Sequence, residues 1–254
     1  MNRREFLATL GASAAAACSP LTAGADPFAL RARPGTPALS IGPGLHRLGL
    51  HPSRDASLFV PSGYRAGVAH PLLVLLHGAG QSSGEWTGAE PLERMLDERG
   101  ILMLAPDSRG VTWEHGDPRD AAFIDAALAW TFARAFVAPA RIALGGFSDG
   151  ASFALSLGLY NGPLFPSLLA FSPCYISTTA RQGKPRVFVS HGMSDTILPY
   201  ANARRIVASL RAESYDVEFE SFGGGHTIGP VVATKALDWF SRVPADAAPR
   251  ARDR

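Results

Sequence analysis

The chain has 254 residues and a formal net charge of +2, a length that allows one large domain with a well-buried core or two small ones. Hydrophobic residues make up 46% of the chain and charged residues 18%, a composition that excludes an intrinsically disordered protein. The basic residues are scattered along the chain and form no stripe with aromatic side chains, so nucleic-acid binding is not expected.

The first 25 residues have the pattern of an export signal. Arg3 and Arg4 precede an apolar, alanine-rich run that ends in small residues, the order typical of twin-arginine export. The run is too short and too weakly apolar for a transmembrane helix. The signal has two possible ends. The residues up to Cys18 resemble a lipobox, whereas residues 23–25 form an A-x-A cleavage site. We therefore expect export to the periplasm or cell envelope, as a soluble or a lipid-anchored protein.

The rest of the chain divides by composition into three parts. Residues 26–44 are rich in proline, glycine and alanine and predict a linker. Residues 45–242 predict a single domain, and residues 243–254 predict a flexible tail. No disulfide is expected for Cys174, because lipidation or cleavage would remove Cys18 as a partner.

Short apolar runs alternate with longer helix-like segments throughout the predicted domain. Residues 45–52 and 55–61 are candidate edge strands. Six further strands are expected over residues 70–78, 98–107, 141–148, 167–173, 185–192 and 216–222. Helices are expected over residues 89–100, 119–136, 151–159, 201–214 and 231–242. This alternation predicts an α/β fold with a mostly parallel sheet covered by helices on both faces, and functional residues at the carboxyl ends of the strands.

The segment from Gly146 to Gly150 has the pattern G-x-S-x-G, centred on Ser148. It lies between a predicted strand and a predicted helix, where this pattern can hold a nucleophilic serine on a sharp turn. The two glycines leave room for strand and helix to approach closely, and N–H groups at the helix start face the same space. On these five residues alone, a serine that caps the helix is the alternative.

A nucleophilic serine needs a base, and imidazole is the side chain with a suitable pKa. His226 follows the last predicted strand in a glycine-rich loop, beyond Ser148 in chain order. His191 directly ends a strand, which favours a structural role. His115 precedes Ser148 and so has the wrong chain order for the base.

An acid must orient this imidazole and stabilise its cation. Asp195 lies a few residues after a predicted strand, in a loop that leads into the next helix. Its alternative role is to cap that helix. Asp216 starts a strand and Asp238 lies in the middle of a helix, so both are weaker candidates for the acid.

Two backbone N–H groups are candidates for binding a developing oxyanion. One belongs to Asp149, and the other to Ala79 in an H-G-x-G loop, with Gly80 as second choice. His77 is expected to brace this loop. The carboxylate of Asp149 would oppose negative charge at the oxyanion, so we expect it to be turned outward and hydrogen-bonded.

Together these motifs resemble the α/β-hydrolases. The chain is most similar to small serine esterases of the carboxylesterase/phospholipase type and of the polyhydroxybutyrate-depolymerase-like, feruloyl-esterase-like group. The resemblance covers about residues 55–241 and rests on the segments PLLVLLHGAGQS, DAAFIDAAL, GFSDGAS, SHGMSDTILPY and GGGHTIG. It implies an α/β-hydrolase domain, and the short connection from Cys174 to Arg186 leaves no room for a large lid.

The resemblance implies a catalytic triad of Ser148, Asp195 and His226 that cleaves a carboxylic ester through an acyl-enzyme, without metal or cofactor. The expected substrate is a small-molecule ester with a small or medium acyl group. A thioesterase, a prolyl-oligopeptidase-like peptidase and a non-enzymatic envelope binding lipoprotein are the alternatives. Candidate substrate contacts are large side chains near the expected cleft, for which packing is the alternative role: Trp86, Trp113, Tyr175, Ile197 and Leu198.

Overall fold

A single sheet of eight strands forms the centre of the protein, seen in a computed structural model that describes residues 26–242. The strands lie in the order β1-β2-β4-β3-β5-β6-β7-β8. Their bounds are Gly44–Arg47 (β1), Ala56–Val60 (β2), His70–Leu76 (β3), Leu102–Pro106 (β4), Val137–Phe147 (β5), Ser167–Phe171 (β6), Arg186–Gly192 (β7) and Val217–Phe222 (β8). From β4 to β8 all neighbours are parallel, whereas β2 runs antiparallel to both β1 and β4.

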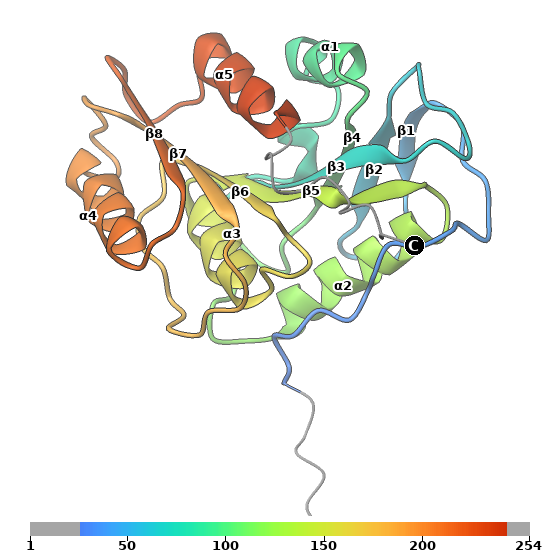
Figure 1. Cartoon of the computed structure of the whole chain (residues 1–254), viewed down its shortest axis with the longest axis horizontal. Coiled ribbons are helices and arrows are strands. Elements are labelled where there is room, and N and C mark those ends of the chain that lie inside the picture. Colours follow the sequence, from blue (N-terminus) through green and yellow to red (C-terminus); the bar gives the residue numbers. More distant parts are fainter. Residues whose placement is uncertain (1–25, 243–254) are drawn as a thin grey trace, which may run out of the picture.

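Helices cover both faces of this sheet, as Figure 1 shows. Their bounds are Glu90–Glu98 (α1), Arg119–Phe132 (α2), Asp149–Tyr160 (α3), Tyr200–Ala212 (α4) and Pro230–Ser241 (α5), with a short 3₁₀ helix at Ser83–Glu85 (η1). Side chains of α1 and α5 share one core layer, and those of α2, α3 and α4 share the other. The predicted α/β architecture, with helices on both faces of a mostly parallel sheet, is confirmed.

Strand β3 shows how the sequence supplies both core layers. Leu72, Val74 and Leu76 pack into the layer of α2, α3 and α4, whereas Leu73 and Leu75 pack into the layer of α1 and α5. Successive side chains of a strand point to opposite faces. A strand covered on both faces therefore needs a continuous apolar run, which is what His-Pro-Leu-Leu-Val-Leu-Leu provides.

The prediction that residues 55–61 form an edge strand is wrong. Strand β2 lies between β1 and β4, and the edges of the sheet are β1 and β8. The cause is β1, which folds back antiparallel onto β2 and covers its outer edge. Four of the five residues of β2 are buried, whereas β1 has none that is fully buried.

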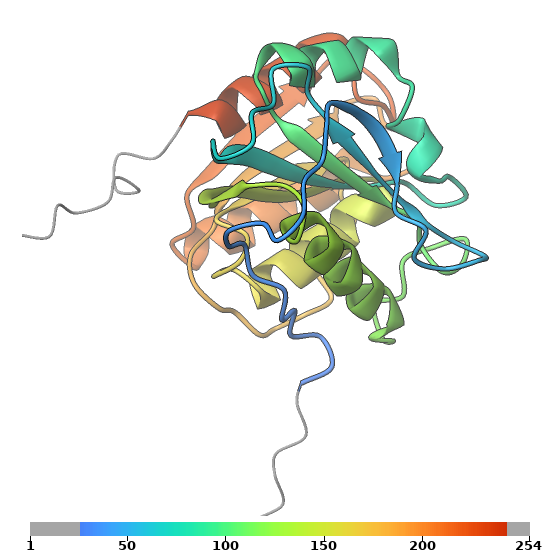
Figure 2. The same cartoon turned by 90° about the vertical axis from the view of Figure 1, so that its right-hand side faces the viewer.

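The predicted linker at residues 26–44 ends at Gly44, where β1 begins, and its residues 26–43 contain no helix or strand but are held against the domain. The buried Leu30 donates its N–H to Oδ1 of Asn161, at the end of α3, at 2.8 Å. Asp125 of α2 accepts two further backbone N–H groups of this segment, both at 2.8 Å. Figure 2 shows the segment in blue, passing beside α2 on its way to β1.

Other predicted segments lie outside the described residues, namely the export signal at 1–25 with Cys18 and the tail at 243–254. Within residues 26–242, none of the helices has the length and apolar character needed to cross a bilayer. The 172–185 connection between β6 and β7 holds neither helix nor strand, in agreement with the expectation that no large lid is inserted there.

Asn161→Ala should weaken the attachment of the N-terminal segment. The substitution removes the acceptor for the Leu30 N–H and the donor to the carbonyl of Phe28. Because a buried N–H then loses its partner, we expect the free energy of unfolding to fall by about 1–3 kcal/mol, measured by chemical denaturation. Gln182→Ala, at an exposed amide, is the matched control, with an expected change below about 0.5 kcal/mol. Equal stability of Asn161→Ala and the unmodified chain would contradict the prediction.

Candidate active site

Ser148 lies on a sharp turn between β5 and α3, with a backbone φ of 57° and ψ of −116°. A Cβ at position 146 would lie 2.4 Å from the carbonyl oxygen of Gly150. A Cβ at position 150 would lie 2.3 Å from the carbonyl oxygen of His77. Both distances are too short for any side chain, so the two glycines of G-x-S-x-G are required by contacts with backbone.

The Ser148 side chain makes no capping bond to α3, which removes the helix-cap alternative. Its Oγ lies 2.8 Å from Nε2 of His226, and Nδ1 of the same imidazole lies 2.6 Å from Oδ2 of Asp195. A carboxylate only accepts hydrogen bonds. We therefore assign the proton to Nδ1, which leaves Nε2 to accept the hydroxyl proton of Ser148.

The sheet brings these three residues together from different strands. Ser148 follows β5, Asp195 follows β7 and His226 follows β8. Since β5, β6, β7 and β8 run parallel in one sheet, with β6 between β5 and β7, their carboxyl ends meet at one edge. Phe147 packs on the imidazole of His226 with ring centroids 4.7 Å apart, which holds the ring over the serine.

Asp195 is held as a buried carboxylate. Its Oδ1 accepts the N–H groups of Ile197 and Leu198 at 2.9 and 2.8 Å, so it does not cap α4. Burial by itself would raise the pKa of Asp195, but these two N–H groups and the imidazole of His226 hold that pKa below the ordinary carboxyl value. The carboxylate therefore remains charged beside the imidazole at neutral pH.

The alternative acids and bases lie in other arrangements. Asp238 pairs with Arg99 at 2.7 Å, and the Asp216 carbonyl accepts a backbone N–H of β7. His191 is fully buried, and its Nε2 lies 2.9 Å from the carbonyl of Leu198 and 3.2 Å from Oδ2 of Asp195. It supports the loop of the acid, as its place at the end of a strand predicts.

The backbone N–H groups of Ala79 and Asp149, the two predicted oxyanion donors, have no acceptor among the described residues, and Asp149 directly follows Ser148 in the chain. Gly80, the second choice for a donor, gives its N–H to the carbonyl of Val111 at 2.7 Å and so is occupied. His77 accepts the N–H of Ser108 through Nε2 at 3.0 Å, which fits the expected bracing role. Both predicted donors are therefore free to bind a ligand oxygen, whereas Gly80 is not.

The Asp149 carboxylate is hydrogen-bonded, as expected for a negative charge next to these donors. Its Oδ2 accepts the backbone N–H of Trp113 at 2.8 Å. Its Oδ1 lies 3.9 Å from Nε2 of His115. The group points toward the loop after β4, and its own helix start is a favourable place for negative charge.

A cleft of about 290 Å³ opens beside His226. Of the five predicted substrate contacts only Trp86 lines it. Five other residues that line the cleft were not predicted from the sequence. They follow the H-G-x-G loop, precede Ser148 or follow His226: Gln81, Glu85, Phe147, Thr227 and Ile228. Proximity to those motifs in the chain was the available signal.

The other predicted contacts lie elsewhere, and the prediction for Trp113 is wrong. Trp113 is only 2% exposed, and its Nε1 donates to the carbonyl of His77 at 2.9 Å. Its side chain is therefore part of the packed interior and does not line the cleft. Tyr175 packs against His115 with ring centroids 4.9 Å apart. Ile197 is exposed, and the described contacts of Leu198 are backbone bonds that support Asp195.

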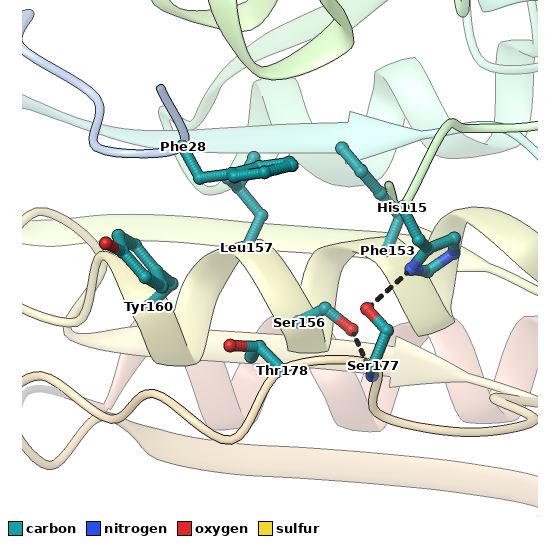
Figure 3. Close-up of a pocket in the computed structure, with 8 residues that line it drawn as sticks. All are labelled: Phe28, His115, Phe153, Ser156, Leu157, Tyr160, Ser177 and Thr178. Carbon is teal, nitrogen blue, oxygen red and sulfur yellow. Dashed lines mark hydrogen bonds between the residues drawn. The ribbon is translucent and has the colours of Figure 1, made fainter. Parts of the chain in front are cut away.

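A second cavity, of about 200 Å³, lies along α3 below the N-terminal segment (Figure 3). None of the predicted site residues lines it. Some of its polar groups bond to one another, since Nδ1 of His115 lies 2.9 Å from the Ser177 hydroxyl and the Ser177 N–H donates to Oγ of Ser156. Nε2 of His115 is buried without a hydrogen-bond partner among the described residues. Within residues 26–242, no group of histidine, cysteine and acidic side chains is arranged to hold a metal ion.

Gly150→Ala should destabilise the fold. The added methyl group would press on the carbonyl oxygen of His77, and we expect the free energy of unfolding to fall by about 1–3 kcal/mol. Gly116→Ala is the control, because nothing lies within 4 Å of its Cβ position, and its stability should stay equal or rise by up to about 1 kcal/mol. Chemical denaturation of both variants is the measurement, and two equal values would show that the close approach is not needed.

Comparison with known proteins gives this geometry a context. Residues 118–241 match the family model described as Phospholipase/Carboxylesterase, whereas no curated protein matches the chain. Esterase PE8 is similar in structure, at 22% identity over 81% of this chain and 100% of that one, with a TM-score of 0.60.

Two further solved structures are similar at lower identity. S-formylglutathione hydrolase from Staphylococcus aureus has 14% identity over 80% of this chain and 99% of that one, with a TM-score of 0.63. A ferulic acid esterase from Anaeromyces mucronatus has 16% identity over 75% and 85%, with a TM-score of 0.61. The predicted fold and the predicted resemblance to carboxylesterases and phospholipases are confirmed.

Proposed function

We propose that this chain, a member of the α/β-hydrolase superfamily, is a serine carboxylic ester hydrolase that works through Ser148, His226 and Asp195. The observation that carries the proposal is the continuous contact from Ser148 Oγ to His226 Nε2 at 2.8 Å and from His226 Nδ1 to Asp195 at 2.6 Å. The family match to phospholipases and carboxylesterases and the esterases among the similar structures support it.

The first half of the reaction acylates the enzyme. Ser148 Oγ attacks the ester carbonyl carbon while Nε2 of His226 takes the hydroxyl proton. The carbonyl oxygen becomes an oxyanion that accepts hydrogen bonds from the N–H groups of Ala79 and Asp149. When the tetrahedral intermediate collapses, the bond to the alcohol oxygen breaks, and His226 returns its proton to that oxygen.

The second half restores the enzyme with water. Nε2 of His226 takes a proton from a water molecule, whose oxygen attacks the acyl carbon bound to Ser148. The second tetrahedral intermediate releases the carboxylic acid, and the proton returns to Ser148 Oγ. Asp195 stays ionised and stabilises the imidazolium in both halves. The predicted export signal would place this activity in the cell envelope.

Ser148→Ala should abolish turnover of p-nitrophenyl acetate and butyrate, because within residues 26–242 the hydroxyl hydrogen-bonded to His226 is that of Ser148. We expect kcat to fall by at least about 10⁴-fold with an unchanged circular dichroism spectrum. A fluorophosphonate probe should label the unmodified protein at Ser148 and leave the variant unlabelled. Ser53→Ala, at an exposed serine, is the control. Full activity in Ser148→Ala would overturn the proposal, and amide cleavage without ester turnover would favour the peptidase alternative.

The cleft beside His226 predicts a preference among esters. Its volume of about 290 Å³ suits a small or medium group, and Glu85 contributes negative charge to its lining. We expect kcat/KM for p-nitrophenyl butyrate to exceed that for the dodecanoate by at least about tenfold. Trp86→Ala should lower this butyrate-to-dodecanoate ratio, because a smaller side chain opens the cleft to a longer acyl group. Trp130→Ala on α2 should leave the ratio unchanged. A ratio of one in the unmodified enzyme would contradict the assignment of this cleft to the substrate.

A further inference from the structure

A chain of hydrogen bonds connects the H-G-x-G loop, which carries the N–H of Ala79, to the start of α3, which carries the N–H of Asp149. The connection runs through the loop after β4, which contributes Val111 and Trp113. We infer that the carboxylate of Asp149 and the indole of Trp113 are positioning residues that hold the two oxyanion donors at a fixed separation. The inference rests on the proposed function and names side chains that this function does not itself require.

The first connection joins the start of α3 to Trp113. Oδ2 of Asp149 accepts the Trp113 backbone N–H at 2.8 Å. The indole stacks on Phe153, one turn further along α3, with centroids 5.5 Å apart and an interplanar angle of 20°. Trp113 is only 2% exposed. The loop after β4 is therefore fixed to the helix that begins at the nucleophile turn.

The second connection joins this loop to the H-G-x-G loop at two points, one on each side of Ala79. Nε1 of Trp113 donates to the carbonyl of His77 at 2.9 Å. The carbonyl of Val111 accepts the N–H of Gly80 at 2.7 Å. The peptide that carries the Ala79 N–H is thus held from both ends, and both bonds lead back through the loop after β4 to Asp149.

The negative charge of Asp149 strengthens this arrangement in two ways and opposes the oxyanion in a third. A charged acceptor makes a stronger hydrogen bond to an N–H group than a neutral one, and the first turn of a helix favours negative charge. The same charge opposes an oxyanion bound at the Asp149 N–H. His115 faces Oδ1 at 3.9 Å, and Tyr175, packed on His115, has its pKa raised by burial and by the charge of Asp149. Asparagine at position 149 would separate the effect of the hydrogen bond from the effect of the charge. Its amide oxygen keeps the acceptor for the Trp113 N–H and removes the negative charge.

The experiment compares three variants in the full chain, namely Asp149→Ala, Asp149→Asn and Trp113→Phe. All three keep the backbone N–H groups that bind the oxyanion. We expect Asp149→Ala and Trp113→Phe to lower kcat by about 10–100-fold, the effect of a small misplacement of catalytic groups, with KM changed less than about twofold. Affinity for a trifluoromethyl ketone, whose adduct carries the oxyanion, should fall by the same factor as kcat.

Asp149→Asn is the conservative rescue. Its amide oxygen can still accept the Trp113 N–H, so it should recover most of the kcat lost in Asp149→Ala. Trp130→Phe on α2 is the matched control, since this indole is half-buried beneath the guanidinium of Arg134 at 4.0 Å. It should leave kcat, KM and ketone affinity unchanged, and thermal melting of every variant checks that the fold is retained.

The results distinguish a failure of the proposed ester hydrolase function from a failure of the positioning role of Asp149 and Trp113. If the unmodified protein turns over no ester and takes up no fluorophosphonate, the proposed function fails. If the unmodified protein is active and Asp149→Ala and Trp113→Phe have its kcat and ketone affinity, the positioning inference fails alone. If Trp113→Phe does not fold, the aspartate pair decides, and equal kcat values in Asp149→Ala and Asp149→Asn overturn the inference.

Discussion

The site depends on one close approach between backbones, where the first turn of α3 meets the end of β3. A Cβ at position 150 would lie 2.3 Å from the carbonyl oxygen of His77 and 2.6 Å from that of Leu76. Only glycine fits there. The approach brings the start of α3, which carries Ser148 and Asp149, against the residues that lead into the H-G-x-G loop with Ala79.

A second close approach brings the acid and base loops together. A Cβ at Gly192, the last residue of β7, would lie 2.3 Å from the carbonyl oxygens of both Gly224 and Gly225. The N–H of Ser194 donates to the carbonyl of Gly224 at 3.0 Å. These contacts bind the loop of Asp195 to the loop of His226. The close approach therefore requires glycine at position 192, whereas the Cβ positions of Gly223 and Gly225 are open.

Negative charge at the site is distributed so that each carboxylate has its own donors. Asp195 accepts two backbone N–H groups and the imidazole of His226. Asp149 accepts the backbone N–H of Trp113. Because hydrogen bonds to the charged form stabilise it, the donors around Asp195 hold its pKa below the ordinary carboxyl value.

Much of this arrangement follows from local patterns in the chain. Apolar runs that end in glycine or polar residues predict eight strands, and the structure has eight in those segments. Ser148, Asp195 and His226 each follow a predicted strand, the acid after the next-but-one and the histidine after the last. This order predicts that they meet, because parallel strands share one carboxyl edge. Such predictions succeed since strand direction and side-chain alternation are properties of the local backbone.

The sequence by itself determined the fold class, the sharp turn at Ser148 and the three side chains that meet there. Only the tertiary structure decided that Trp113 is buried beneath the H-G-x-G loop, that β2 is covered by β1, and which residues line the cleft. The physical reason is that the exposure of a side chain depends on what packs over it. For Trp113 that partner is Phe153, forty residues away in the chain, and no local pattern specifies such a neighbour.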